Sequence, residues 1–445
     1  MESERISISD RLKPSMRPIP RRGGGFIPVL LALALAAVPG YSFGSDGPSI
    51  SLSKAYRLAL ENNEDIQIAR EGLNQGHLLM KEALTVLIPR LTANAGTSKQ
   101  YFTDGTSAGS KNWGLTLEQT LFAGGRTWIA RKGAQYTLKS AEYGLAFARQ
   151  SVLMGVVSGF YDTLTVGRLV RLKEDAVERL KEQLRSAKAR FDVGDAPKTD
   201  VLSARAGLSG AKVDLVQARK GLIMARRRLE NLIGAPLPKS VQVPPGVGIP
   251  EKSLAELKDM ARLQRADLLQ GRELIKVSEQ QAKLTAGGRR PSVKLSGSFT
   301  RYDENAPFVP EKTVSLKLDW PFFQGGLVGL QAEEAYSKTR QEKERYGRMV
   351  KADLLAVENA LRDLEAFRAQ DDLVRSTLDD AKETFRLERL QFDLGGAVSL
   401  DVLRAQDKLA EAENAVAAQQ YEMGRARALL LYSIGALDLG AFGFK

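Results

Sequence analysis

The residue types that carry most enzyme chemistry are scarce in this chain. His77 is the only histidine, it lies inside a helical pattern, and there is no cysteine. A His-based catalytic triad or a His/Cys metal cluster is therefore implausible. Segment 105–111 resembles a phosphate-binding loop only superficially, because its spacing is wrong and the flanking pattern predicts a strand hairpin. We expect no enzyme activity, no metal and no cofactor.

One short motif occurs twice. Segment 191–202 reads FDVGDAPKTDVL, and segment 392–403 reads FDLGGAVSLDVL, 201 positions later. Glycine readily adopts the left-handed conformation that closes a helix, so each copy predicts a helix, a tight turn and a second helix. Asp200 and Asp401 begin the second helices, where a carboxylate is favoured by the helix dipole.

Other markers show that the whole chain is duplicated. Gly124 and Gly125 recur 201 positions later as Gly325 and Gly326, and Pro89 recurs 202 positions later as Pro291. Several markers in constant order indicate an internal repeat rather than chance. The offset between the two copies changes from 202 to 201 between Pro89 and Gly124, in a region where we expect a surface loop.

Helical patterns open and close each copy. Apolar residues fall seven apart through 52–87 and 254–282, which indicates supercoiled helices packed along a seam and ended by Pro89 and Pro291. Segment 126–192 contains no proline and predicts a rod about 100 Å long. In 201–232, one seam position carries large side chains and the other carries mostly alanine, so neighbouring helices can approach closely.

Two segments per copy alternate apolar and polar residues. The apolar positions are Leu91, Ala93, Ala95, Trp113, Leu115, Leu117 and Leu121 in the first copy, and Val293, Leu295, Phe299, Val314, Leu316, Leu318, Trp320 and Phe322 in the second. Segments of about 10 residues with one apolar face have the length of membrane-barrel strands. Polar loops are expected at 103–111 and 303–312. The alternative is a soluble four-stranded sheet with one buried face.

The remaining segments set the expected boundaries. Basic residues precede an apolar run at 26–38, and small residues follow it, so 1–44 reads as an export signal peptide, with Met16 an alternative start. We expect a first repeat at 45–234 with strands at about 90–122, a proline-rich linker at 235–252, a second repeat at 253–437 with strands at about 292–323, and a tail at 438–445. The net charge is +12, but the Lys and Arg residues are interleaved with Asp and Glu along the helices. This pattern favours solvated helical faces over nucleic-acid binding.

These pieces predict a mainly α chain with a small β part, built from a duplicated helix-strand-strand-helix-hairpin-helix unit. Four strands cannot close a barrel, and open strand edges are forbidden in lipid. Several chains must therefore pool their strands, and a twelve-stranded barrel would need three. The long helices would form a bundle or a tube.

The sequence resembles the TolC family of outer-membrane efflux and secretion channels over about 50–440. Segment 119–126 reads QTLFAGGR, close to the family's Q-x-L-F-x-G-G pattern, and 320–326 repeats it in part as WPFFQGG. The segments 191–202 and 392–403 resemble the family's hairpin motif F/Y-x-x-G-x(5)-D-V-L.

The resemblance implies a homotrimer with a twelve-stranded barrel in outer-membrane lipid, continued by a periplasmic helical barrel. The two hairpin turns would lie at the periplasmic end, where the tunnel narrows and meets a periplasmic adaptor protein that recruits an inner-membrane transporter. The chain would then be a passive exit duct of a tripartite efflux or type I secretion system. Gly124, Gly125, Gly325 and Gly326 would form the strand-to-helix junctions.

The resemblance also implies site residues. Asp401, Arg404 and Asp200 would line the periplasmic constriction, where a ring of Asp401 carboxylates would favour cations. Arg404 replaces a second acidic residue found in some relatives, and Phe392 and Ala397 lack the polar side chains of a tightly bonded gate, so the closed state is expected to be held differently or less firmly. The expected adaptor contacts are Phe191, Val193, Gly194, Val201, Leu202, Phe392, Leu394, Gly395, Val402 and Leu403. The alternative is that the apolar residues among them simply pack the hairpin.

An exported coiled-coil scaffold, or a periplasmic adaptor without a channel, is the rival interpretation. An adaptor would normally carry one helical hairpin within β-rich domains, whereas this chain has two hairpins and few strands. Recovery in the soluble periplasm would defeat the channel interpretation. The sequence does not identify the transported substrate.

Overall fold

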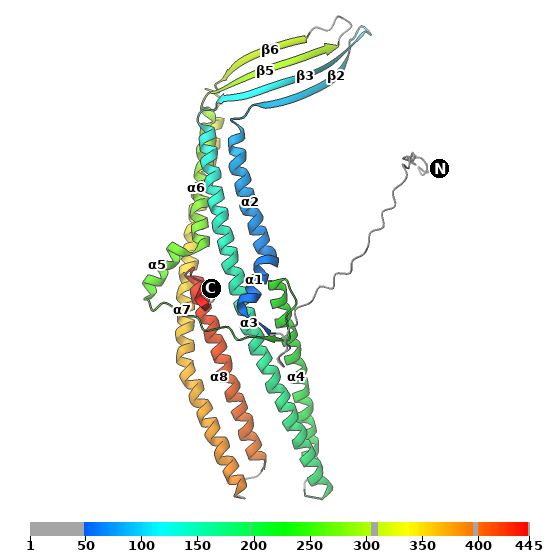
Figure 1. The fold of residues 1–445 in the computed structure, drawn as a ribbon, viewed down its shortest axis with the longest axis vertical. Helices are drawn as coiled ribbons and strands as arrows, with labels where there is room; N and C mark the ends of the chain where they lie inside the picture. The colour runs from blue at the N-terminus through cyan, green and yellow to red at the C-terminus, as the bar shows by residue number, and fades with distance from the viewer. Residues whose placement is uncertain (1–48, 196, 304–309, 395–398, 444–445) are drawn as a thin grey trace, which may run out of the picture. The chain divides into compact units, whose positions relative to one another are not determined.

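The computed structural model describes residues 49–443 except 196, 304–309 and 395–398. The predicted duplicated unit is confirmed (Figure 1). The first copy contains α1 (Leu52–Asn62), α2 (Glu64–Thr85), β2 (Arg90–Tyr101), β3 (Ser107–Phe122), α3 (Arg126–Asp192) and α4 (Lys198–Ile233). The second contains α5 (Leu254–Gln264), α6 (Ala266–Ala286), β5 (Ser292–Asp303), β6 (Pro310–Asp319), α7 (Leu327–Asp393) and α8 (Ser399–Ser433).

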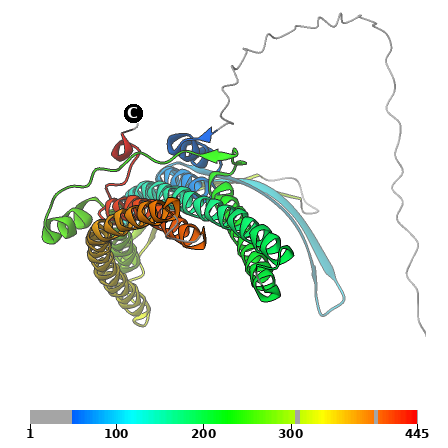
Figure 2. The ribbon, with the colours of Figure 1, turned by 90° about the horizontal axis from the view of Figure 1, so that it is seen from below.

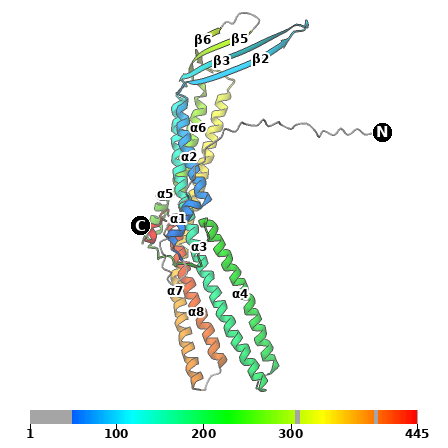
Figure 3. The same cartoon turned by 45° about the vertical axis from the view of Figure 1, so that its right-hand side comes forward.

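The strands and the helical turns lie at opposite ends of α3 and α7. Each of these helices has 67 residues, which corresponds to about 100 Å. The strands join one end, and the hairpins α3–α4 and α7–α8 turn at the other (Figure 3). No described helix is both long enough and apolar enough to cross a membrane.

The four long strands form one antiparallel sheet in the order β2-β3-β5-β6. The pairing of β3 with β5 joins the first copy to the second. A separate two-residue strand, β1 (Ser49–Ile50), pairs in parallel with β4 (Ser240–Val241) in the linker. This small sheet was not expected, because two residues carry no readable periodicity.

The helices that precede the strands are broken in both copies, whereas one continuous heptad helix was expected in each. Asn63 separates α1 from α2 with extended backbone angles, φ −69° and ψ 129°. Its side-chain oxygen accepts a hydrogen bond from Asp65 N (3.1 Å), and its Nδ2 donates to Leu232 O at the end of α4 (3.1 Å). The heptad spacing survives across the break, which is why periodicity alone did not reveal it.

Arg265 occupies the same place in the second copy. It separates α5 from α6 at φ −62° and ψ 122°, and its Nη1 donates to Ser433 O at the end of α8 (3.1 Å). Asn63 and Arg265 are 202 positions apart, and Leu232 and Ser433 are 201 apart, the two offsets of the duplication. A side chain at each break therefore fastens the short helix pair to the last turn of a hairpin.

The hydrophobic core lies around these breaks. Viewed along the long helices, α1 and α5 lie on the convex side of a curved helical layer (Figure 2). The fully buried large side chains of this core include Leu52, Ile66, Leu153, Phe160, Leu229, Ile233, Leu257, Leu364, Leu430 and Ile434. The packing that stabilises the chain is thus concentrated midway along α3 and α7.

The break in the second copy contains buried charge. Arg265 Nη2 lies 2.5 Å from Asp267 Oδ2 and 2.9 Å from Asp353 Oδ1 on α7. Burial raises the pKa of Asp353 to about 6; Arg265 opposes this rise, and Asp267 adds to it. Val152, which is buried, stands at the corresponding position of the first copy. This titratable group is therefore present in one copy only.

Replacing Asp353 with Asn should change how stability depends on pH. A raised pKa means that the folded state holds the proton more tightly than the unfolded chain, so this carboxyl's contribution to stability falls as pH rises from 3.8 through about 6. Between pH 5 and 7.5, Asp353→Asn should gain about 1 kcal/mol relative to the unmodified protein. Unfolding followed by circular dichroism at both pH values measures it. Asn63→Ala is the matched control, and its cost of about 1 kcal/mol should not vary with pH; a constant difference for Asp353→Asn would contradict this assignment.

Candidate functional site

The predicted apolar residues of the strands lie in register on one face of the sheet. Leu115 pairs with Ala93 and Phe299, and Leu295 pairs with Leu316. The rings of Trp113 and Phe299 are 5.7 Å apart on this face. We call this surface the apolar face; it comprises Leu91, Trp113, Leu115, Leu117, Leu295, Phe299, Val314, Leu316 and Leu318.

The apolar face is open rather than covered. Leu316 is 67% exposed and Val314 is 82% exposed, and every residue of β2 and β6 is exposed. A soluble sheet would bury such a face to remove apolar surface from water. The exposed band instead fits contact with lipid.

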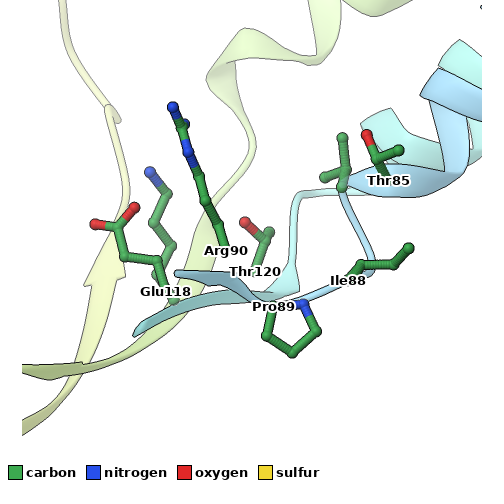
Figure 4. A pocket seen from close by; sticks show the side chains of 8 residues that line it. Thr85, Ile88, Pro89, Arg90, Glu118 and Thr120 are labelled. Carbon is green, nitrogen blue, oxygen red and sulfur yellow. The ribbon is translucent and has the colours of Figure 1, made fainter. Parts of the chain in front are cut away.

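The opposite face is polar. Ser98 Oγ lies 3.0 Å from Ser110 Oγ, and Ser296 Oγ lies 2.7 Å from Ser315 Oγ. At the helix end of the sheet, Arg90 pairs in register with Glu118, and their side chains extend to the same side of the ribbon (Figure 4). An open hollow beside them is lined by Thr85, Val86, Ile88, Pro89, Arg90, Glu118, Thr120 and Lys294. In the described part of the chain, no group of three or more His, Cys, Asp or Glu residues is placed to hold a metal ion.

Two details of the strands differ from expectation. The turn between β2 and β3 is tighter than the loop expected at 103–111, because β3 already begins at Ser107. Asp104 Oδ1 accepts hydrogen bonds from the backbone and hydroxyl of Thr106, at 2.9 and 2.6 Å, and so closes this turn. In addition, β6 ends at Asp319, so Trp320 and Phe322 lie beyond the strand.

The four junction glycines all adopt left-handed backbone angles. Gly124 and Gly125 have φ +61° and +78°, and Gly325 and Gly326 have φ +57° and +84°. The first junction is crowded: a Cβ on Gly124 would lie 2.5 Å from Arg290 Cβ, and Arg290 Nη1 donates to Gly124 O at 3.0 Å. The second junction is open, because a Cβ on Gly325 or Gly326 would meet no atom within 4 Å.

The first hairpin turn is closed by glycine, as the motif indicates. Gly194 has φ +79°, and Asp195 N donates to Arg190 O across it (2.8 Å). An ion pair of 3.0 Å between Arg190 and Asp195 adds to this closure. The corresponding Gly395 and its neighbours Gly396, Ala397 and Val398 lie outside the described residues.

The expected constriction residues lie at the starts of α4 and α8. Asp200 is exposed in the first turn of α4, and the Asp401 side chain is 42% exposed in the first turn of α8. Arg404 Nη1 lies 3.6 Å from Asp401 Oδ1, so a cation accompanies this carboxylate. The sequence contains the signal for this pair, since residues three apart share a helix face.

The expected adaptor-contact residues divide by exposure. Val193 and Leu394 are 80% and 78% exposed, and Phe191 and Leu202 are about half exposed. Val201 is buried, so packing within the hairpin accounts for it, and Val402 and Leu403 are intermediate. The side chain of Phe392 lies outside the described residues.

Polar contacts between the hairpins were missed by sequence reasoning. Arg179 on α3 forms an ion pair with Asp407 on α8, Arg168 Nε donates to Asn414 Oδ1 at 3.1 Å, and Arg425 lies 3.6 Å from Asp162. These partners are more than 200 positions apart. In the sequence these side chains resemble ordinary solvent-exposed polar residues, because nothing there shows that α3 and α8 are neighbours.

Comparison with known proteins gives one consistent result. The family model described as "Outer membrane efflux protein" matches residues 55–235 and 257–436. The alkaline protease secretion protein AprF of Pseudomonas aeruginosa is 26% identical over 88% of this chain and 86% of its own length. The outer membrane efflux protein BepC of Brucella suis is 24% identical over 90% of this chain and 89% of its own length.

Solved structures share the fold. The CmeC outer membrane channel of Campylobacter jejuni superposes with a TM-score of 0.74 at 19% identity, covering 86% of this chain and 85% of that one. The family match falls on both copies of the duplicated unit and includes the strands, the junction glycines and the hairpins. The chain belongs to the outer membrane efflux protein family and is an outer-membrane channel protein.

Proposed function

We propose that three copies of this chain form a closed twelve-stranded barrel and a helical tunnel. This assembly is the passive exit duct of a tripartite efflux or type I secretion system. The observation that carries the proposal is the strand order β2-β3-β5-β6, which leaves β2 and β6 as open edges. Unpaired strand backbone is not tolerated in lipid, so these edges need partners.

The duplication identifies those partners. Inside the chain, β3 of the first copy pairs with β5 of the second. The counterpart of β3 is β6 and the counterpart of β5 is β2, so β6 should pair with β2 of the next protomer in the same way. The pair Leu117 and Gly297 then corresponds to Leu318 and Ala95 between chains.

This pairing accounts for two asymmetries of the single chain. β3 extends to Phe122 beside β5, whereas β6 stops at Asp319 and leaves Phe322 and Phe323 84% and 79% exposed. Gly124 packs on Arg290, whereas Gly325 has open space around it. A neighbouring β2 would extend β6, and the turn before that β2 would pack on Gly325.

A cysteine pair tests the interchain register directly, because the chain has no cysteine of its own. Leu318→Cys combined with Ala95→Cys should give disulfide-linked trimers in outer membranes treated with copper phenanthroline, since facing Cβ atoms lie about 5 Å apart. Denaturing, non-reducing gels report the products.

Two controls accompany this pair. Leu117→Cys with Gly297→Cys, facing positions within one chain, should cross-link without linking chains. Leu318→Cys with Asn94→Cys places one thiol on the opposite face and should cross-link at least about tenfold less. Monomers only from the 318/95 pair, or recovery of the protein from the soluble periplasm, would defeat the proposal.

We further propose that the hairpin turns contact a periplasmic adaptor protein, which connects the duct to an inner-membrane transporter. The exposed apolar side chains of Val193, Leu202 and Leu394 support this role, because they have no covering partner within the described chain. Phe191, Gly194, Phe392 and Gly395 belong to the same two sequence motifs.

Charge at the first turn should interrupt transport without preventing assembly. A Cβ on Gly194 meets nothing within 4 Å, so only its φ of +79° opposes substitution, at about 1–2 kcal/mol. Gly194→Arg should abolish export while the trimer remains in the outer membrane, and Gly194→Ala, with the same backbone strain and no charge, should keep most of it. Export assays with quantified membrane trimer measure both, and normal export by Gly194→Arg would refute the contact.

We propose that Asp401, with Arg404 and Asp200, lines the constriction of the tunnel. Three Asp401 carboxylates would favour cations, and the neighbouring Arg404 would weaken that preference. In planar bilayers, Asp401→Asn should lower the cation-to-anion permeability ratio at least about twofold, and Arg404→Ala should raise it. Unchanged reversal potentials in both variants would place these residues away from the constriction.

The cargo class stays within the range that the relatives suggest. AprF is named for alkaline protease secretion and BepC for efflux. Either cargo agrees with a passive duct whose energy comes from the transporter. We also propose that 1–44 is an export signal, and that the repeats 45–234 and 253–437, joined by the linker 235–252, are the units that alternate around the assembly.

A further inference from the structure

The apolar face of the sheet changes character along the strands. Near the helices it carries leucine and valine, and from the level of Trp113 and Phe299 toward the end away from the helices it becomes basic. Four cationic residues, one from each strand, occupy this end: Lys99, Lys111, Arg301 and Lys312. All four side chains are exposed.

The register places these four residues on the apolar face. Arg301 pairs with Trp113, and Lys312 pairs with Phe299. Lys111 lies two residues from Trp113 on β3, and residues two apart point to the same side of a strand. Lys99 lies over the ring of Tyr101, with Nζ 5.2 Å from its centroid. Among the described residues, Asp303, in register with Lys111, is the one acidic position at this end of the apolar face.

The polar face shows no such excess. At the same end it carries Gln100, Ser110, Tyr302 and Glu311, none of which is basic. Basic residues of the polar face lie instead near the helices, at Arg90, Lys294 and Lys317. Cationic residues are therefore concentrated on the face that meets lipid, along a diagonal that crosses the four strands in steps of two residues.

Because the strands of a membrane barrel are tilted, such a diagonal can lie level with the lipid headgroups. From Leu121 to Trp113 the apolar stretch of β3 covers about 26 Å along the strand, or about 20 Å of membrane depth at the tilt typical of barrels. Lysine on the lipid face is costly at mid-membrane and much less so at the interface. Trp113, at the end of the apolar stretch, is the kind of aromatic residue favoured at that interface.

We propose that Lys99, Lys111, Arg301 and Lys312 form a binding site for the phosphate groups of lipid A in the outer leaflet. The inference rests on the proposed barrel, in which this end of the strands points away from the periplasmic helices. Lipid A is the main phosphate-bearing lipid of that leaflet, and its acyl chains would lie against Leu115, Phe299 and Val314. Three copies of the site would surround the barrel.

The test measures binding of bis-phosphorylated lipid A to the purified trimer in dodecyl maltoside by native mass spectrometry. The variant Lys99→Gln/Lys111→Gln/Lys312→Gln removes three charges and keeps Arg301, which makes other interactions. We expect it to bind lipid A at least tenfold more weakly. The control Arg90→Gln/Lys294→Gln/Lys317→Gln removes three charges from the polar face and should bind within twofold of the unmodified trimer.

Two outcomes overturn the site: binding by the first variant within twofold of the unmodified trimer, or an equal loss in the control. Equal affinity of the unmodified trimer for phosphatidylglycerol would overturn the assignment to lipid A. If the triple variant does not assemble, Lys312→Gln alone should weaken binding about threefold, and no change would refute the site. Failure of the 318/95 cross-link refutes the barrel itself, whereas a cross-linked trimer without lipid A preference refutes only this site.

Discussion

The hydrogen-bonding requirement of strand backbone governs this structure. Four strands in one sheet satisfy their inner neighbours but leave one edge of β2 and one edge of β6 without partners. With an exposed apolar face, the sheet cannot remain an isolated ribbon in lipid. The proposed pairing with a neighbouring β2 accounts for the early end of β6 and the open space around Gly325. In the proposed assembly the single chain is one segment of a ring, and its two unpaired strand edges lie where the next segments belong.

The stabilising core lies far from that sheet. Buried apolar side chains gather where α1, α5 and the ends of α4 and α8 pack on α3 and α7. The breaks at Asn63 and Arg265 let the short helices turn out of the long-helix layer and cover this region. The packed core therefore lies midway along the long helices, and the two ends of the molecule remain exposed and available for contact with lipid and other proteins.

Much of this arrangement was readable from the sequence. The duplicated motifs predicted the order of elements, the alternation predicted the apolar face, and Gly194 marked the end of α3. The helix breaks were missed because the apolar repeat continues through Asn63 and Arg265. The end of β6 was mispredicted because alternation reports side-chain faces and not whether a partner strand exists. The Arg179–Asp407 pair was invisible because sequence gives no measure of which solvated charges meet across 228 positions.

The difference between Asn63 and Arg265 has a consequence for symmetry. Gene duplication gives a trimer six similar units, and a ring of six identical joints would respond uniformly to its surroundings. Here a joint without a buried ion pair would alternate with one that contains Arg265 and Asp353. The proposed trimer would therefore be threefold in chemistry although the duplication makes its six units similar. Divergence at two pairs of positions, 63/265 and 152/353, is enough to give alternate units different sensitivities to proton concentration in the periplasm.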